Sequence, residues 1–306
     1  MSEETYALSR LDSAFDHAKS LLWPVRWDIW LRLAVVALFV GCGIDSLGNS
    51  NLPYAAGSLV LGSTMSVMVS SIAAVVLGIA LLWLLAGATM QFVFVDMLST
   101  GDIHIRRFFR ERLGKGARLF LFELALIAVM ILAIAAFVFM LIGVEGAGAA
   151  TSLLIIALIP VILVAALLFG LVFLLTTDFV VPIMIREDCG IIAGWRRLIG
   201  MIASRFWQTV IYVIVRFVLG LVAAIAQVIL VILALVVIAI PFILVGIVLL
   251  AALQENIVLL LALVIPYLII AIPVALLIAV PFITFFRYYA LLVLEGLLPE
   301  YRLLPE

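Results

Sequence analysis

Residues 217–240, FVLGLVAAIAQVILVILALVVIAI, contain no charged side chain and a single glutamine, Gln227. About 20 consecutive apolar residues are needed for a helix to cross the hydrocarbon core of a bilayer. The apolar block around this stretch runs from 208 to 253. Five more apolar blocks lie along the chain, at 27–44, 66–97, 117–142, 152–182 and 257–294. We therefore expect an all-α integral membrane protein with about six transmembrane helices.

The composition of the whole chain supports this prediction. Of the 306 residues, 68% are hydrophobic and 11% are charged, whereas a soluble domain is about half apolar and a quarter charged. The mean hydropathy is +1.45. So many apolar side chains cannot all be hidden inside the protein, so most must face lipid. The formal net charge of −1 gives no support for nucleic acid as a partner.

The distribution of Lys and Arg predicts the orientation, because these residues accumulate in cytoplasmic loops. The connections at 45–65, 143–152 and 254–256 contain neither residue. All 17 basic residues lie near the two chain ends or in and beside the connections at 98–116 and 183–207. Six spans with both ends in the cytoplasm fit this pattern. We expect a single membrane domain, 1–306, in the cell membrane. It divides into a cytoplasmic amphipathic N-terminal helix (1–26), a transmembrane bundle (27–294) and a cytoplasmic tail (295–306).

Prolines interrupt the last two blocks. The block at 208–253 would extend about 70 Å as one helix, against roughly 30 Å of hydrocarbon. Pro241 is expected to break it and leave an outer half-helix or re-entrant piece, and the block at 257–294 carries Pro266, Pro273 and Pro281. Splitting both blocks would give eight spans, the alternative to six.

Two segments have the pattern of amphipathic helices at the membrane interface. In 8–22, one apolar face consists of Leu11, Phe15, Ala18 and Leu22. In 191–206, an apolar stripe is flanked by arginines: Ile191, Trp195, Leu198, Ile202 and Phe206 form the stripe. An apolar stripe beside basic residues is typical of an in-plane membrane helix. A helix packed under the bundle is the other interpretation, and the two can hold together.

Searches for catalytic and metal-binding motifs find nothing. The chain has no phosphate-binding Gly-rich loop, GxSxG, CxxC or HExxH motif. His17 and His104 lie in different segments without ligand partners, and Asp102 and Glu111 alternate with arginines as in a solvated charged loop. Cys42 and Cys189 fall on opposite predicted sides of the membrane. We expect no cofactor, no metal and no enzymatic activity.

Ionisable residues lie within a few turns of the same predicted membrane face in every span. They form a candidate cytoplasmic-side polar cluster: Asp28, Arg32, Asp96, Glu123, Asp178, Arg216 and Arg287. A charge costs about 2.5–3.5 kcal/mol at the bilayer centre on insertion scales, and less near the interface, where arginine can snorkel. One hypothesis is that the cluster consists of snorkelling residues and interhelical ion pairs that fix the bundle. The other is a polar cavity open to the cytoplasm, and Glu123 and Arg216 are the deepest pair to test.

Three stretches resemble an archaeal family of multi-pass membrane proteins of unknown function. These are LDSAF with LLWPVRWDIWLRLAVVALFVG (11–15 and 21–41), TTDFVVPIMIREDCGIIAGWRRL (176–198) and FFRYYALLVLEGLLPEYRL (285–303). The pattern from Asp178 and Pro182 to Gly190 and Trp195 is also similar to the membrane domain joined to some bacterial glycerophosphodiester phosphodiesterases. That similarity implies a membrane-domain architecture without the enzyme, because the catalytic barrel has no room in this chain.

The leading functional prediction is a non-enzymatic scaffold or a binding platform for membrane lipid, a protein partner or a second copy of the chain. The alternative is a transporter or exporter of an apolar or amphiphilic solute. The scarcity of ionisable residues in the middle of the spans counts against coupling to protons or cations. A membrane-embedded enzyme is the third hypothesis, for which Asp96, Glu123 and Asp178 are the candidate acids.

Overall fold

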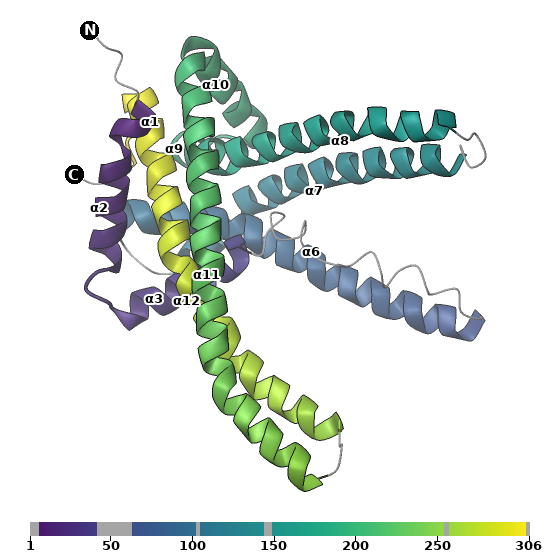
Figure 1. Ribbon diagram of the computed structural model, residues 1–306. Helices are drawn as coiled ribbons and strands as arrows, with labels where there is room; N and C mark the ends of the chain where they lie inside the picture. The colour runs from purple at the N-terminus through teal and green to yellow at the C-terminus, as the bar shows by residue number, and fades with distance from the viewer. Residues whose placement is uncertain (1–5, 42–62, 102–104, 144–148, 254–256, 304–306) are drawn as a thin grey trace. The chain divides into compact units, whose positions relative to one another are not determined.

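The protein is helical throughout the described chain. The computed structural model describes residues 6–41, 63–101, 105–143, 149–253 and 257–303, and no strand occurs within these ranges. This confirms the prediction of an all-α protein. The helices, labelled in Figure 1 where there is room, are α1 (Tyr6–Ser9), α2 (Leu11–Leu22), α3 (Trp27–Gly41), α6 (Ser63–Thr100), α7 (Ile105–Gly143), α8 (Ala149–Leu175), the π-helix η1 (Thr176–Val180), α9 (Val181–Arg186), α10 (Ile191–Ser204), α11 (Phe206–Leu253), α12 (Ile257–Leu297) and the 3-10 helix η2 (Pro299–Tyr301).

Five stretches of helix in the described chain are long and apolar enough to cross a membrane: Ser71–Thr100, Ile105–Phe139, Leu158–Arg186, Phe206–Val248 and Leu263–Leu297. They correspond to five of the six predicted blocks. The remaining block begins with α3, whose 15 residues extend about 22 Å, less than the roughly 30 Å of hydrocarbon. Residues 42–44 of that block lie outside the described residues. The sixth span therefore stays a prediction.

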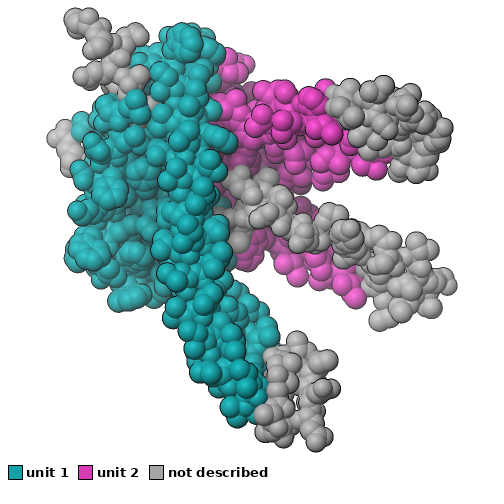
Figure 2. Space-filling model, in the orientation of Figure 1, with its two compact units in different colours: residues 1–61, 97–105, 202–306 teal, residues 62–96, 106–201 magenta. Residues whose placement is uncertain are grey.

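The helices form two compact units, which Figure 2 shows in different colours. Unit 1 comprises residues 1–61, 97–105 and 202–306, and unit 2 comprises residues 62–96 and 106–201. Each unit is built from discontinuous segments of the chain. The single membrane domain over 1–306 stays a prediction.

Helix α12 is the centre of unit 1, because α1, α2, α3 and α11 all pack against it. Its residues from Arg287 to Leu294 are buried on every side. Tyr289 stacks on Tyr212 of α11 with ring centroids 5.5 Å apart, and His17 of α2 contacts the ring of Tyr288 at 5.6 Å. The N-terminal helix α2 thus lies beside the C-terminal part of α12 (Figure 1).

Helices α6 and α7 of unit 2 approach each other closely at Gly116. A Cβ atom at this glycine would lie 2.8 Å from the Cα atom of Thr89, closer than such atoms come in real structures. Small residues allow the backbones of membrane helices to approach in this way. The packing of α6 on α7 therefore requires glycine at position 116.

The helix that begins with α8 ends in a π-helical turn and the short helix α9. The turn that follows, at residues 187–190, is called the elbow below. Pro182 has no backbone N–H, so the α-helical hydrogen bond to the carbonyl of Asp178 cannot form. The helical turn just before this proline is wider than an α-helical turn, because the N–H of Val181 donates to the carbonyl of Thr176, five residues back. The hydroxyl of Thr176 donates to the carbonyl of Val172 at 2.6 Å. The chain then turns between α9 and α10, at residues 187–190.

Helices α11 and α12 continue through their prolines, contrary to the expected break at Pro241. Helix α11 runs without interruption through Pro241, and α12 runs through Pro266, Pro273 and Pro281. Figure 1 shows both helices bending along their lower parts. Ending a helix inside lipid would leave several backbone groups without partners, whereas one proline removes a single hydrogen bond. This difference favours a continuous, bent helix over a helix end.

The two predicted amphipathic segments form helices, and each buries part of the face predicted for it. In α2, the predicted Ala18 and Leu22 are buried together with Ala14, whereas the predicted Phe15 is 60% exposed. In α10, the buried residues are Gly194, Leu198 and Met201. Both helices pack on the rest of their own unit, and their position at a membrane interface stays a prediction.

Candidate functional site

A bidentate ion pair joins the end of α6 to the first turns of α7. Arg112 donates through Nε to Asp96 Oδ2 at 2.6 Å and through Nη2 to Oδ1 at 3.1 Å. The Asp96 side chain is 6% exposed and that of Arg112 is 24% exposed. A carboxylate this deeply buried needs such a partner, because an unpaired buried charge is strongly destabilising. Asp96 was predicted as a site residue, but its partner Arg112 was not.

Lys115, one turn further along α7, holds the elbow between α9 and α10. Its Nζ donates to the carbonyl of Met184 at 2.8 Å and lies 2.5 Å from Asp188 Oδ1. The Met184 carbonyl belongs to the last turn of α9, where carbonyls have no partner within the helix. Gly194 of α10 packs at this point as well, since a Cβ there would meet Val180 at 2.8 Å. Lys115 was not among the site residues predicted from the sequence.

Two further predicted carboxylates of unit 2 are buried. Glu123 on α7 and Asp178 in η1 are each 6% exposed. Glu123 continues the face of α7 that carries Arg112, Gly116 and Leu119, at helical spacings of four, three and four residues. This helical spacing is the sequence pattern that could have predicted that Arg112 faces the interior of unit 2. The pairing of Glu123, in unit 2, with Arg216, in unit 1, stays a prediction.

The remaining predicted residues belong to unit 1. Arg216 of α11 places its guanidinium carbon 3.9 Å from the centroid of the Phe286 ring on α12, a cation–π contact. Arg287 is 5% exposed within the centre of α12. Asp28 and Arg32 are both exposed on α3. The structure therefore divides the predicted cluster into buried carboxylates in unit 2 and two arginines of α11 and α12 in unit 1, with an exposed pair on α3.

Arginines are exposed on α7, α9 and α10 of unit 2. Three acids are exposed in the described part of this unit, and each has a base within ion-pair distance: Arg107 for Glu111 at 3.2 Å, Arg197 for Glu187 at 3.3 Å and Lys115 for Asp188 at 2.5 Å. Five more arginines are exposed there. We call them the arginine surface: Arg106, Arg110, Arg118, Arg186 and Arg196.

Helix formation places Glu111 differently from the predicted charged loop. Helix α7 begins at Ile105, so Glu111 and Arg107 form an exposed i,i+4 pair on its first turns. Asp102 and His104 lie outside the described residues. The basic connection predicted at 98–116 is thus largely helical. The helix fixes the side on which each of its described charged side chains lies.

The elbow contains two groups with shifted pKa values. The hydrogen bond and charge of Lys115 lower the pKa of the Asp188 carboxyl below its ordinary 3.8. Burial raises the pKa of the Cys189 thiol, with a further contribution from Glu187. Asp188 also has φ +51°, a left-handed conformation that aspartate and asparagine adopt more readily than most residues. Among the described residues, Cys189 is a free thiol.

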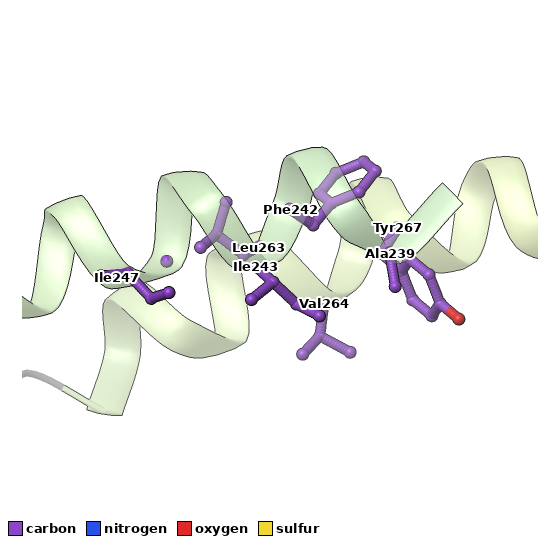
Figure 3. Close-up of a pocket in the computed structure, with 8 residues that line it drawn as sticks. Ala239, Phe242, Ile243, Ile247, Leu263, Val264 and Tyr267 are labelled. Atoms are coloured by element: carbon purple, nitrogen blue, oxygen red, sulfur yellow. The ribbon is translucent and has the colours of Figure 1, made fainter. Parts of the chain in front are cut away.

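An apolar groove lies between α11 and α12 within unit 1. It has a volume of about 400 Å³, and Figure 3 shows Phe242 and Ile243 of α11 opposite Leu263, Val264 and Tyr267 of α12. The rings of Phe242 and Tyr267 meet edge to face with centroids 5.7 Å apart. The lining offers an apolar ligand contact area but almost no polar group.

The described residues contain no group of three or more His, Cys, Asp or Glu side chains that could hold a metal ion. His17 is used locally, since its Nδ1 donates to the carbonyl of Ser13 at 2.7 Å and its ring packs on Tyr288.

Comparison with known proteins gives one match. The sequence is similar over residues 5–304 to a family described as "Family of unknown function (DUF7544)". No curated protein and no solved structure matches. The predicted similarity to the membrane domain of glycerophosphodiester phosphodiesterases thus stays a prediction, as does an archaeal origin.

Proposed function

We propose that this chain, which belongs to the DUF7544 family of unknown function, is a non-enzymatic membrane component that binds an anionic partner. The binding face is the arginine surface of unit 2. One observation carries the proposal: every exposed acid in the described part of this unit is already within ion-pair distance of another base, and five arginines remain exposed.

The buried contacts support this role as a scaffold. Asp96 with Arg112 and Lys115 with the elbow fix α6, α7, α9 and α10 relative to one another within unit 2. Binding to a surface that is already ordered loses less conformational entropy than binding to a mobile one. The buried carboxylates accordingly have a structural role and the exposed arginines a binding role.

The proposed location is the cell membrane, with both chain ends and the arginine surface in the cytoplasm. The absence of Lys and Arg from 45–65, 143–152 and 254–256 supports this orientation. The contact of α2 with the C-terminal part of α12 agrees with it, because it brings both ends of unit 1 together. Helix α3 would begin the first of six spans.

Purification from native membranes tests the proposal. The protein should retain an acidic protein or an anionic lipid that is lost at high salt, because screening weakens contacts between exposed charges. Both co-purifying proteins and lipids are identified by mass spectrometry. Recovery of a monomer with no anionic partner at low salt would refute the proposal.

The groove between α11 and α12 favours transport of an apolar solute as a second candidate function. Its volume of about 400 Å³ is within the roughly 300–1,000 Å³ of ligand-binding pockets. Ala239→Phe would fill the groove. If the protein is a transporter, this variant should slow the passage of an apolar dye across proteoliposomes that contain the wild-type protein at equal density. Equal rates for wild type, variant and protein-free vesicles would exclude this function.

A further inference from the structure

We infer that the anionic partner of the arginine surface is the phosphate of anionic phospholipids, and that α10 lies in the membrane interface to bind it. The inference rests on the proposed function and names the partner of the same surface. An acidic protein segment is the competing partner.

The outward face of α10 combines two isoleucines with an arginine. Ile192 is 77% exposed and Ile199 is 59% exposed, and Arg196 is exposed between them. Spacings of four and three residues put all three on one side of the helix. Gly194 and Leu198 are buried on the other side. The outward face is therefore apolar and basic at the same time.

This combination fits the boundary between headgroups and acyl chains. Helix α10 has 14 residues and extends about 21 Å, too short to cross the hydrocarbon. An interfacial helix buries its apolar side chains several ångströms below the headgroups while its arginines reach the phosphates. Contact with an acidic segment in water would leave Ile192 and Ile199 exposed. The isoleucines thus favour lipid over an acidic protein.

Every exposed base in the described part of unit 2 is an arginine, whereas the one lysine there, Lys115, is largely buried in the elbow. The guanidinium group donates two parallel hydrogen bonds to phosphate oxygens, which an ammonium group cannot do. The chemistry of this surface therefore suits phosphate.

A contact within unit 2 places Arg118 of α7 beside the segment that joins α9 to α10. Arg118 Nη1 of α7 lies 3.9 Å from the position that a Cβ of Gly190 would occupy. Gly190 directly precedes α10 and follows Arg186, the last residue of α9, by four residues. The bonds of Lys115 to Met184 and Asp188 fix this approach. Arg118 thus lies at the start of α10.

The experiment measures lipid retention by the full-length protein. The protein is reconstituted in nanodiscs that contain phosphatidylcholine with a minor fraction of phosphatidylglycerol, and then transferred to mild detergent. Retained phosphatidylglycerol is quantified by native mass spectrometry. The double variant Arg118→Gln/Arg196→Gln should bind it roughly 30-fold more weakly than wild type, the loss expected for two basic residues at a membrane surface.

A matched control uses arginines of the same two helices. Arg107→Gln/Arg197→Gln removes the same charge, but these arginines already bind Glu111 and Glu187. It should retain much more phosphatidylglycerol than the first double variant. Equal losses would overturn the inference, because they would indicate a diffuse positive potential rather than binding by the arginine surface.

A second pair of measurements separates this inference from the proposed function. Ile192→Ser/Ile199→Ser keeps every charge, so it should weaken lipid retention and leave binding of a polyglutamate peptide unchanged. Polyglutamate binding without any preference for phosphatidylglycerol would overturn the inference and leave the proposed function intact. Failure to bind either probe would overturn both. The helical content of each variant is checked by circular dichroism.

Discussion

Arg112 of α7 and Asp96 of α6 meet through two hydrogen bonds of 2.6 and 3.1 Å, with the carboxylate almost wholly buried. The geometry matches the planar guanidinium to both carboxylate oxygens, the strongest arrangement of such a pair. The two residues are sixteen positions apart in the chain, and they join two consecutive candidate spans. This pair therefore ties the end of one candidate span to the beginning of the next.

Removing one partner of the Asp96–Arg112 pair should lower the stability of the folded protein. Arg112→Met removes both hydrogen bonds of the guanidinium to the buried Asp96 carboxylate, so the free energy of unfolding should fall by about 3–5 kcal/mol. Thermal and denaturant unfolding in detergent micelles measures the change. The double variant Asp96→Asn/Arg112→Met should be more stable than Arg112→Met alone. Arg107→Gln, in an exposed pair, is the control, with an expected loss of about 1 kcal/mol or less.

Gly116 should not tolerate a larger residue. Gly116→Ala places a methyl group against Thr89, so overpacking should lower the free energy of unfolding by about 1–3 kcal/mol. Gly114→Ala is the matched control, because nothing lies within 4 Å of its Cβ position. In a helix interior this control should be neutral or stabilising by up to about 1 kcal/mol. Equal effects of the two substitutions would contradict close packing at Gly116.

The pair of Lys115 and Asp188 should respond to acid. The pKa of Asp188 is lowered in the folded protein, so its ion pair adds stability above the ordinary value of 3.8, and this contribution is lost as pH falls through the lowered pKa. Asp188→Asn keeps a residue that accepts the positive φ. The unfolding temperature of wild type should exceed that of the variant at neutral pH. The difference should shrink at a pH well below 3.8, and a pH-independent difference would contradict the assigned ion pair.

The contact between Arg216 and Phe286 should be measurable as a coupling energy. Phe286→Leu removes the ring under the guanidinium and should weaken the cation–π attraction by about 0.5–2 kcal/mol. A double-mutant cycle with Arg216→Gln isolates this interaction from the loss of packing. Phe286→Tyr keeps an aromatic face and should retain most of the coupling. Additive effects of Phe286→Leu and Arg216→Gln would show that the contact contributes nothing.

Reporter fusions test the orientation. A reporter that is active only in the cytoplasm should be active at both the N- and the C-terminus, because all basic residues lie near cytoplasmic segments in the six-span arrangement. A fusion after residue 148, in the outer connection, should be inactive. Activity at only one terminus would indicate an odd number of spans, as if α3 did not cross the membrane.

Several contacts in the structure could not be predicted from the sequence alone. The face that α2 turns toward α12 depends on the rotation of α2 about its axis. In the structure this rotation buries Ala14 and leaves Phe15 exposed. Both alternatives leave an amphipathic pattern, so composition could not separate them. Likewise, the sequence alone does not show that Arg118 of α7 lies beside Gly190, 72 residues further along the chain.

The sequence by itself determined the positions of five helices that are long and apolar enough to cross a membrane. Hydrophobic length is a property of one segment, and lipid requires that segment to be helical. Only the tertiary structure decided that Asp96 meets Arg112, that Lys115 holds the elbow and that five arginines of unit 2 stay exposed. The physical reason is that ion pairing depends on helix rotation and on the close approach that Gly116 allows. Both are set by packing between segments.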